Sequence, residues 1–154
     1  MIKNLFLLSL FALSLAGCGA ARFSAPQLAP AASGPSVDIF APGARVRQVI
    51  AQRAVRRGTQ VVANDPRGVV LERALPQTSP VLEASCGPHQ PGRRIRIELL
   101  TDERPGVTQV TERRLVLDGG GVCPVRLNAA DIDEANRSLN ELKQQVETGR
   151  RASR

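Results

Sequence analysis

The clearest pattern of apolar and polar positions lies along residues 94–100, where the sequence RIRIELL alternates almost strictly. Alternate side chains of a β-strand point to opposite faces, so the apolar positions would share one face and the charged positions the other. Residues 107–117 (VTQVTERRLVL) have a similar character and follow a turn over residues 102–106. The two segments predict a β-hairpin in an antiparallel sheet with one face open to water.

Weaker strand signals lie on both sides of this hairpin. Residues 59–63 (TQVVA) and 69–73 (VVLER) flank the turn sequence Asn64–Gly68, which predicts a second hairpin with a five-residue connection. The other short strands that we expect cover residues 37–40, 81–86 and 122–127. Pro124 cannot donate a hydrogen bond within a sheet, so the segment 122–127 would be an edge strand or an extended segment.

The first of two predicted helices covers residues 43–57. Pro42 suits the first turn of a helix, and Gly58 suits the position just after its end. Apolar side chains recur within this segment at helical spacing. They are Val46, Val49, Ile50 and Ala54.

The second predicted helix begins at Asn128 or Asp131, either of which can cap it, and runs to about Thr148. Its apolar residues form one narrow seam, which would either pack on the sheet or bind a partner helix. We expect it to pack on the sheet. The seam consists of Ile132, Ala135, Leu139, Leu142 and Val146.

Together these elements predict a single α+β domain over residues 37–149. Its antiparallel sheet would have four to six strands, with an N-terminal and a C-terminal helix packed on one face. The aromatic residues after position 17 are Phe23 and Phe40, so the core must be aliphatic. Residues 150–154 form a short basic tail.

The first 18 residues, MIKNLFLLSLFALSLAGC, have the layout of an export signal: a cation, an apolar stretch and small residues before a cleavage point. The apolar stretch is short for a bilayer core of about 30 Å. The residues Leu15-Ala16-Gly17-Cys18 resemble the lipobox of bacterial lipoproteins, and the resemblance covers these 18 residues alone. The alternative is a plain signal peptide followed by a chance cysteine.

The lipoprotein resemblance implies that residues 1–17 are removed and that Cys18 carries lipid on its thiol. Acylation with a fatty acid such as palmitate would then anchor the chain in a membrane. Residues 18–36 are rich in Ala, Pro, Ser and Gly and would form a flexible tether. In enteric-type lipoproteins, an Asp directly after the lipidated Cys favours retention in the inner membrane. Here Gly19 takes that position, so we expect the anchor to lie in the outer membrane, facing the periplasm.

The chain has three cysteines, and Cys86 and Cys123 remain once Cys18 is assigned to lipid. Outside the cytoplasm a disulfide is the expected state of such a pair. Two free thiols and an intermolecular link are the alternatives. A metal site or a nucleophile built from Cys86 and His89 is also conceivable, but structural zinc normally takes four ligands. We therefore expect no metal, no cofactor and no catalytic residue.

Basic residues exceed acidic ones by 21 to 14, a formal net charge of +7. The near absence of aromatic side chains, together with export, argues against nucleic acid as the partner. Envelope anions remain: lipid or lipopolysaccharide phosphates and peptidoglycan carboxylates, which arginine binds well. Arg45 and Arg56 on the first predicted helix are the candidate anion-binding residues. The alternative is an ordinary solvated helix face.

These observations favour a lipid-anchored envelope protein with a non-enzymatic binding or scaffolding role, whose partners would include other envelope proteins. One alternative is an accessory subunit of a secretion, conjugation or outer-membrane assembly apparatus. Another is an exported hydrolase or metal-dependent enzyme. No motif in the sequence connects the domain to a known activity.

Overall fold

A computed structural model describes residues 34–76 and 80–151 of the chain. The predicted export signal, the predicted lipidation site at Cys18 and most of the predicted tether lie outside the described residues. The elements, in chain order, are β1 (Ser36–Ile39), α1 (Gly43–Arg56), β2 (Gln60–Asp65), β3 (Gly68–Ala74), α2 (Pro80–Cys86), β4 (Arg94–Arg104), β5 (Val107–Asp118), β6 (Gly121–Pro124) and α3 (Ala129–Arg151).

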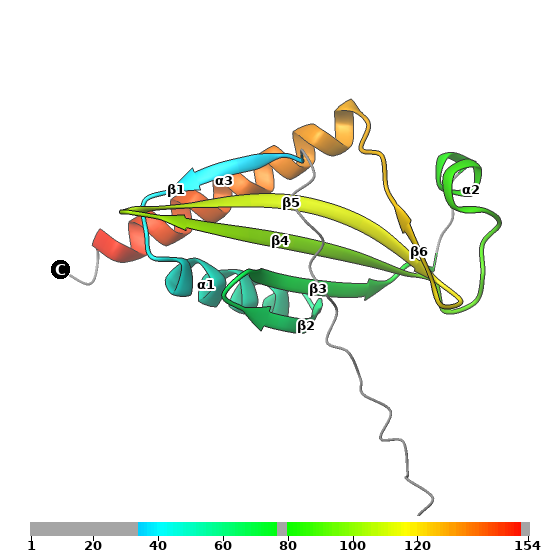
Figure 1. The fold of residues 1–154 in the computed structure, drawn as a ribbon, viewed down its shortest axis with the longest axis horizontal. Helices are drawn as coiled ribbons and strands as arrows, with labels where there is room; N and C mark the ends of the chain where they lie inside the picture. The colour runs from blue at the N-terminus through cyan, green and yellow to red at the C-terminus, as the bar shows by residue number, and fades with distance from the viewer. Residues whose placement is uncertain (1–33, 77–79, 152–154) are drawn as a thin grey trace, which may run out of the picture.

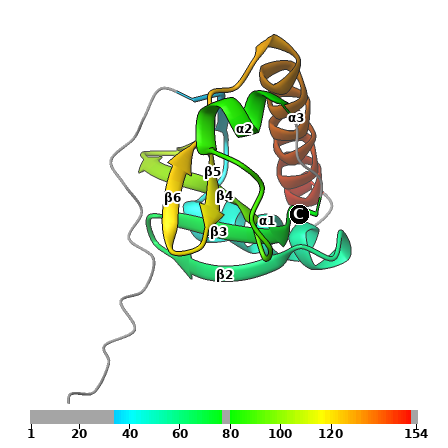
Figure 2. The ribbon, with the colours of Figure 1, turned by 90° about the vertical axis from the view of Figure 1, so that its right-hand side faces the viewer.

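The six strands form one antiparallel sheet in the spatial order β1-β5-β4-β3-β2, and β6 pairs with the far end of β5. The long helices α1 and α3 pack on this sheet (Figure 1), and a second view shows them on the same side of it (Figure 2). The predicted α+β fold, with two helices on one face, is therefore confirmed.

The central hairpin of β4 and β5 is also confirmed. Its strands pair from Arg94 opposite Leu117 to Arg104 opposite Val107. β4 is longer than the alternation indicated, because the turn takes only Pro105 and Gly106. Gly106 has a φ of +80°, a conformation that glycine adopts without strain.

The hairpin of β2 and β3 is tighter than expected, since its connection is the two residues Pro66 and Arg67 and not five. The Asp65 carboxylate accepts a hydrogen bond of 2.7 Å from the backbone N–H of Arg67, which closes the turn. Asp65 and Gly68 can then pair as the last residues of the two strands. A Cβ atom at Gly68 would collide with the carbonyl oxygen of Leu99, so this close approach requires glycine.

The prediction of a strand at residues 81–86 was wrong, because these residues form the helix α2. A short apolar run does not distinguish a strand from a helix by its period alone. Pro80 takes the first helical position, where its missing N–H costs nothing, and Glu83 lies in the first turn, where the helix dipole favours a carboxylate.

The core lies between the two long helices and the sheet. It contains the predicted apolar positions of both helices with one exception, Ile132, which is 39% exposed at the start of α3. The sheet contributes Ile39, Val69, Leu71, Leu99 and Val110. The seam of α3 thus packs inward, as expected.

Reciprocal hydrogen bonds cap the start of α3. The Asn128 side-chain oxygen accepts a 3.0 Å bond from the backbone N–H of Asp131, and the Asp131 carboxylate accepts one of 3.2 Å from the backbone N–H of Asn128. This arrangement works as a capping box does, by satisfying donors that the first turn leaves free. The helix then continues through Gly149 to Arg151, beyond the end that the sequence indicated.

Candidate functional site

The two long helices leave one end of the sheet face uncovered. The row of apolar side chains that β4 directs toward the helices shows where the cover ends: Leu99 is 8% exposed, whereas Ile95 and Ile97 are only half-buried. Both isoleucines lie where the C-terminal end of α1 and the first half of α3 leave a space above the sheet. The central strand of the sheet therefore keeps an apolar surface that neither helix closes over.

A cavity of about 260 Å³ occupies this space. Its apolar lining comes from the four elements that meet there, β3, β4, α1 and α3: Leu71, Ile95, Ile97, Leu99, Ile50, Ala54, Leu139 and Leu142. Its polar lining consists mainly of arginine and glutamate: Arg53, Arg57, Arg73, Arg114, Glu112, Glu134, Thr59 and Ser138. A concave apolar surface with a few converging polar groups is the usual form of a small-ligand site.

On the α1 side of the rim, two arginines share one carboxylate. A guanidinium nitrogen of Arg53 lies 3.1 Å from a carboxylate oxygen of Glu141, and a nitrogen of Arg57 lies 3.5 Å from the same oxygen. Burial lowers the pKa of Arg53, the adjacent charge of Arg57 lowers it further, and Glu141 opposes both effects. The carboxylate is itself 53% exposed, so it compensates the two cations incompletely.

On the β5 side, carboxylates outnumber the single cation among the described residues, Arg114. The Nε atom of Arg114 lies 2.7 Å from Oε1 of the buried Glu112. The same guanidinium is 3.8 Å from Asp131 and 3.9 Å from Glu134. Because Arg114 already lies near three carboxylates, it would attract an additional anion only weakly.

Arg73 at the end of β3 completes the rim, and its side chain is exposed to solvent. Within residues 34–76 and 80–151, its guanidinium makes no hydrogen bond and no ion pair. Arg57, whose side chain is 61% exposed, is the other cation of the rim with free capacity. Among the described residues, the rim is therefore polarised, with positive charge in excess on the side of α1 and β3.

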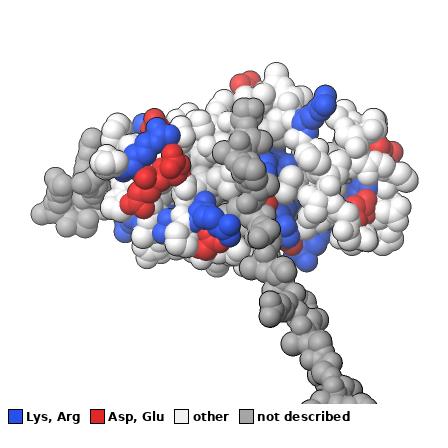
Figure 3. All heavy atoms as spheres, viewed as in Figure 1, with Lys and Arg blue, Asp and Glu red and all other residues white. Residues whose placement is uncertain are grey.

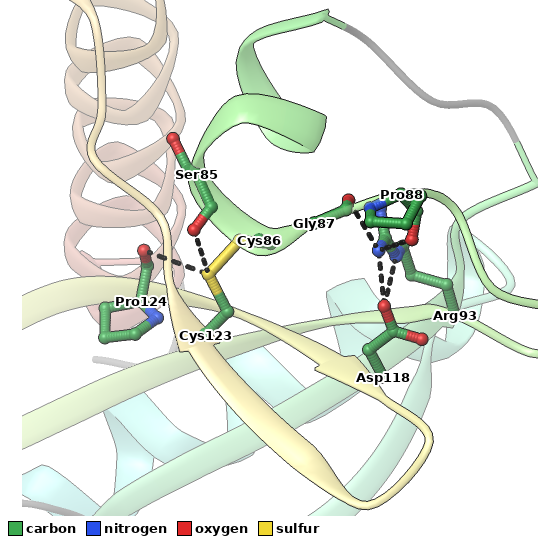
Figure 4. Close-up of a disulfide and its surroundings, with 8 residues drawn as sticks. All are labelled: Ser85, Cys86, Gly87, Pro88, Arg93, Asp118, Cys123 and Pro124. Carbon is green, nitrogen blue, oxygen red and sulfur yellow. Dashed lines mark hydrogen bonds and ion pairs between the residues drawn. A yellow bond between two sulfur atoms is a disulfide. The ribbon is translucent and has the colours of Figure 1, made fainter.

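A second cluster of polar groups surrounds the disulfide. Cys86 at the end of α2 is bonded to Cys123 of β6, and their Cα atoms are 5.7 Å apart (Figure 4). The sulfur of Cys123 also lies 3.5 Å from the carbonyl oxygen of Ser85. The bond ties α2 to the end of the sheet that α1 and α3 leave open.

Arg93, which is 2% exposed, holds the loop after α2 against the end of β5. It forms an ion pair with Asp118 and donates hydrogen bonds to the carbonyl oxygens of Gly87 (3.1 Å) and Pro88 (2.7 Å), as Figure 4 shows. Arginine suits this task because one guanidinium can serve several acceptors at fixed angles. We assign Arg93 a structural role, since its buried guanidinium joins the loop after α2 to Asp118.

The structure brings together some of the residues that the sequence singled out. Cys86 and Cys123 form the predicted disulfide, which uses both thiols that a metal site or a nucleophile with His89 would need. Arg45 and Arg56 both lie exposed on α1. They are eleven positions apart, which is about three helical turns and places them on one side of the helix. The same spacing separates them by about 16 Å, so they cannot bind one small ion together.

The cavity was not predicted from the sequence. Arg53 and Arg57 gave the one available signal, because they interrupt the apolar stripe of the first helix. A charged residue at the border of such a stripe is usually covered along its stem and solvated at its tip. Only the relative placement of α1, α3 and the sheet shows that both border a cavity.

The fold and the cavity define a class of protein: a small disulfide-bonded α+β domain with an open, partly apolar cavity. The chain matches no protein-family model and no curated protein sequence. Disulfides persist mainly outside the cytoplasm, so the bond between Cys86 and Cys123 indicates an extracytoplasmic location. Among the described residues, no helix is both long enough and apolar enough to cross a membrane.

Proposed function

We propose that this chain is a cell-envelope protein, anchored by lipid on Cys18, whose domain has a non-enzymatic binding or scaffolding role. The observation that carries the proposal is the disulfide between Cys86 and Cys123. It accounts for two of the three cysteines, and the third is the one that follows Leu-Ala-Gly. The cavity supports the binding role, since it offers a small partner both apolar surface and arginine donors.

Fatty-acid incorporation tests the anchor. Cells that express the chain are grown with an alkyne analogue of palmitate, and the purified protein is then coupled to a fluorophore. The wild-type chain is expected to be labelled, and C18S is expected to lose the label because its hydroxyl is not a substrate for thioether formation. The double variant C86S/C123S is the matched control and should remain labelled. Equal labelling of C18S and the wild type would contradict the proposal.

We place the anchor in the outer membrane, facing the periplasm, because Gly19 and not Asp follows Cys18. Separation of inner and outer membranes on a sucrose gradient tests this placement in an enteric host. The wild-type chain should sediment with the outer membrane, and G19D should shift toward the inner membrane. A wild-type chain found in the inner membrane would overturn the placement and leave the anchor itself intact.

We further propose that the exposed arginines of α1, Arg45 and Arg56, contact envelope anions. Their separation along the helix suits an extended anionic surface better than a single ion. Flotation with phosphatidylglycerol vesicles, or sedimentation with peptidoglycan sacculi, should retain the wild-type chain more than R45Q/R56Q. The control R67Q/R104Q removes the same charge from the two hairpin ends. Equal retention of R45Q/R56Q and the wild type would dismiss this contact.

A further inference from the structure

The open cavity between α1, α3 and the sheet has a size and a charge distribution that define a ligand. A cavity of about 150 Å³ is known to hold six carbon atoms as benzene, so by proportion 260 Å³ holds about ten non-hydrogen atoms. This is smaller than a drug-sized ligand and suits a short chain. The half-buried Ile95 and Ile97 offer such a chain an apolar floor.

The charges around the rim of the cavity indicate which polar group the ligand carries. Arg57 and Arg73 present exposed guanidinium groups on one side of the cavity. The carboxylate that pairs with Arg57 is that of Glu141. On the opposite side Arg114 is already held by Glu112. An anionic head would therefore be attracted to the side of α1 and β3, and a guanidinium matches the planar geometry of a carboxylate.

We propose that the cavity binds a small aliphatic carboxylate. Its chain lies along Ile95 and Ile97, and its carboxylate is bound by Arg57 and Arg73. The proposal rests on the binding role proposed above and names the ligand class. Burial of the chain supplies most of the affinity, because the arginines lie at an exposed rim where ion pairs are weak. The arginines supply the preference for an anion.

Octanoate, with eight carbons and two oxygens, is the probe. The full chain is purified as the cell processes it, held in lipid nanodiscs, and labelled with ¹³C at the isoleucine methyl groups. Octanoate should shift the methyl signals of Ile95 and Ile97 saturably, with a Kd below about 1 mM. Ile39, on the far part of the same core, should not shift. Titration of empty nanodiscs corrects for partition of octanoate into lipid.

Two comparison ligands separate the parts of the proposal. Octanol keeps the chain and lacks the charge, so it should bind at least several-fold more weakly than octanoate. Acetate keeps the charge and lacks the chain, so it should not shift the isoleucine signals at the same concentration. Octanol binding as tightly as octanoate would overturn recognition of the carboxylate. Shifts confined to other isoleucines, or no saturable shift, would overturn the site.

The variant R57Q/R73Q should raise the Kd for octanoate about tenfold, because it removes both exposed guanidinium groups that would bind the carboxylate. R67Q/R104Q removes two equally exposed positive charges at the hairpin ends and should leave the Kd within about twofold. Unchanged isoleucine signals outside the cavity would show that both variants are folded. Equal Kd values for R57Q/R73Q and the wild type would overturn the assignment of the head-group site.

A peptide C-terminus is the other source of an aliphatic carboxylate, and the dipeptide N-acetyl-Leu-Val tests it. Tighter binding of this dipeptide than of octanoate, lost in its C-terminal amide, would overturn the small-molecule ligand in favour of a protein terminus. The isoleucine shifts do not depend on lipid at Cys18. Failure of the ligand proposal and failure of the anchor proposal would therefore be seen in separate measurements.

Discussion

On the face of the sheet that α1 and α3 cover, the centre is apolar, and Val69, Leu99 and Val110 are buried there. On the opposite face, the centre contains charged residues that are also buried. Glu98 is 1% exposed and forms an ion pair with Arg113, whose side chain is 16% exposed. The central strand β4 thus contributes a buried aliphatic side chain, Leu99, to one face and a buried, paired carboxylate, Glu98, to the other.

The alternation of apolar and charged positions predicted only part of the character of this second face. Charged alternate positions indicated a face open to water, where an Arg–Glu pair stabilises little. Instead Glu72 is buried as well and lies 2.6 Å from a nitrogen of Arg96 and 3.2 Å from one of Arg94. Figure 3 shows the side of the molecule that Figure 1 presents, with basic and acidic atoms side by side. Burial makes these pairs sensitive to the loss of either partner.

The largest effect is expected from Arg113→Met, which leaves the buried carboxylate of Glu98 without its cation. Removing one partner of a buried pair costs about 3–5 kcal/mol of unfolding free energy, because the remaining charge is neither solvated nor paired. Urea unfolding of the variant should therefore show a loss of about 4 kcal/mol.

The double replacement Glu98→Leu with Arg113→Met distinguishes burial of a charge from loss of packing. It removes both charges and keeps apolar volume, so the loss should fall to about 1 kcal/mol or less. If the double variant were as unstable as Arg113→Met, the unpaired carboxylate would not be the cause. The second face would then depend on side-chain packing alone.

On the helix-covered face, Leu99→Ala should cost about 3 kcal/mol, since it leaves a cavity in a packed region. Ile97→Ala, one position along the same row, should cost about 1 kcal/mol because Ile97 is only half-buried, whereas Leu99 is 8% exposed. Thermal and urea unfolding of the two variants measure this difference directly. Equal losses would mean that the cavity is closed in solution.

The disulfide stabilises the open end of the sheet. Removing Cys86 and Cys123 together, as C86S/C123S, should cost about 2 kcal/mol, less than the ~4 kcal/mol that chain entropy allows for a loop of 37 residues. The smaller value is expected because α2 can unfold locally while the rest of the domain stays folded. Amide hydrogen exchange should then increase in α2 and β6 and stay unchanged in α1. Faster exchange throughout the sheet would contradict a local role.

Much of the fold could be predicted from local patterns. The alternation along β4 located the central hairpin, and the seam from Ala135 to Val146 located the buried side of α3, because both patterns depend on one neighbouring surface. The pattern failed for α2, whose seven residues are too few to show a helical period. It also failed for Ile132, which has the spacing of the seam but lies exposed at the start of the helix.

The cavity and the buried charges could not be predicted in this way. Ile97 and Leu99 are equivalent in the sequence, and only the placement of α1 and α3 above the sheet makes one half-buried and the other buried. Likewise Glu98 and Asp102 are both acidic residues on one strand and one face, and their different exposure depends on their position within the whole sheet. Such properties arise from the arrangement of several elements.

The smallest effect is expected from Arg104→Met at the turn end of β4. Arg104 lies 2.9 Å from Asp102, and the two side chains are 55% and 64% exposed. Water solvates either charge when the other is removed, so the loss should stay below about 0.5 kcal/mol and should shrink further in 1 M salt. Arg113→Met should lose nearly the same stability at both salt concentrations, since a buried pair is weakly screened. Because both variants replace arginine by methionine next to a carboxylate in the same hairpin, their difference measures burial. A loss at Arg104 as large as that at Arg113 would show that pairing, and not burial, determines the stability of this face.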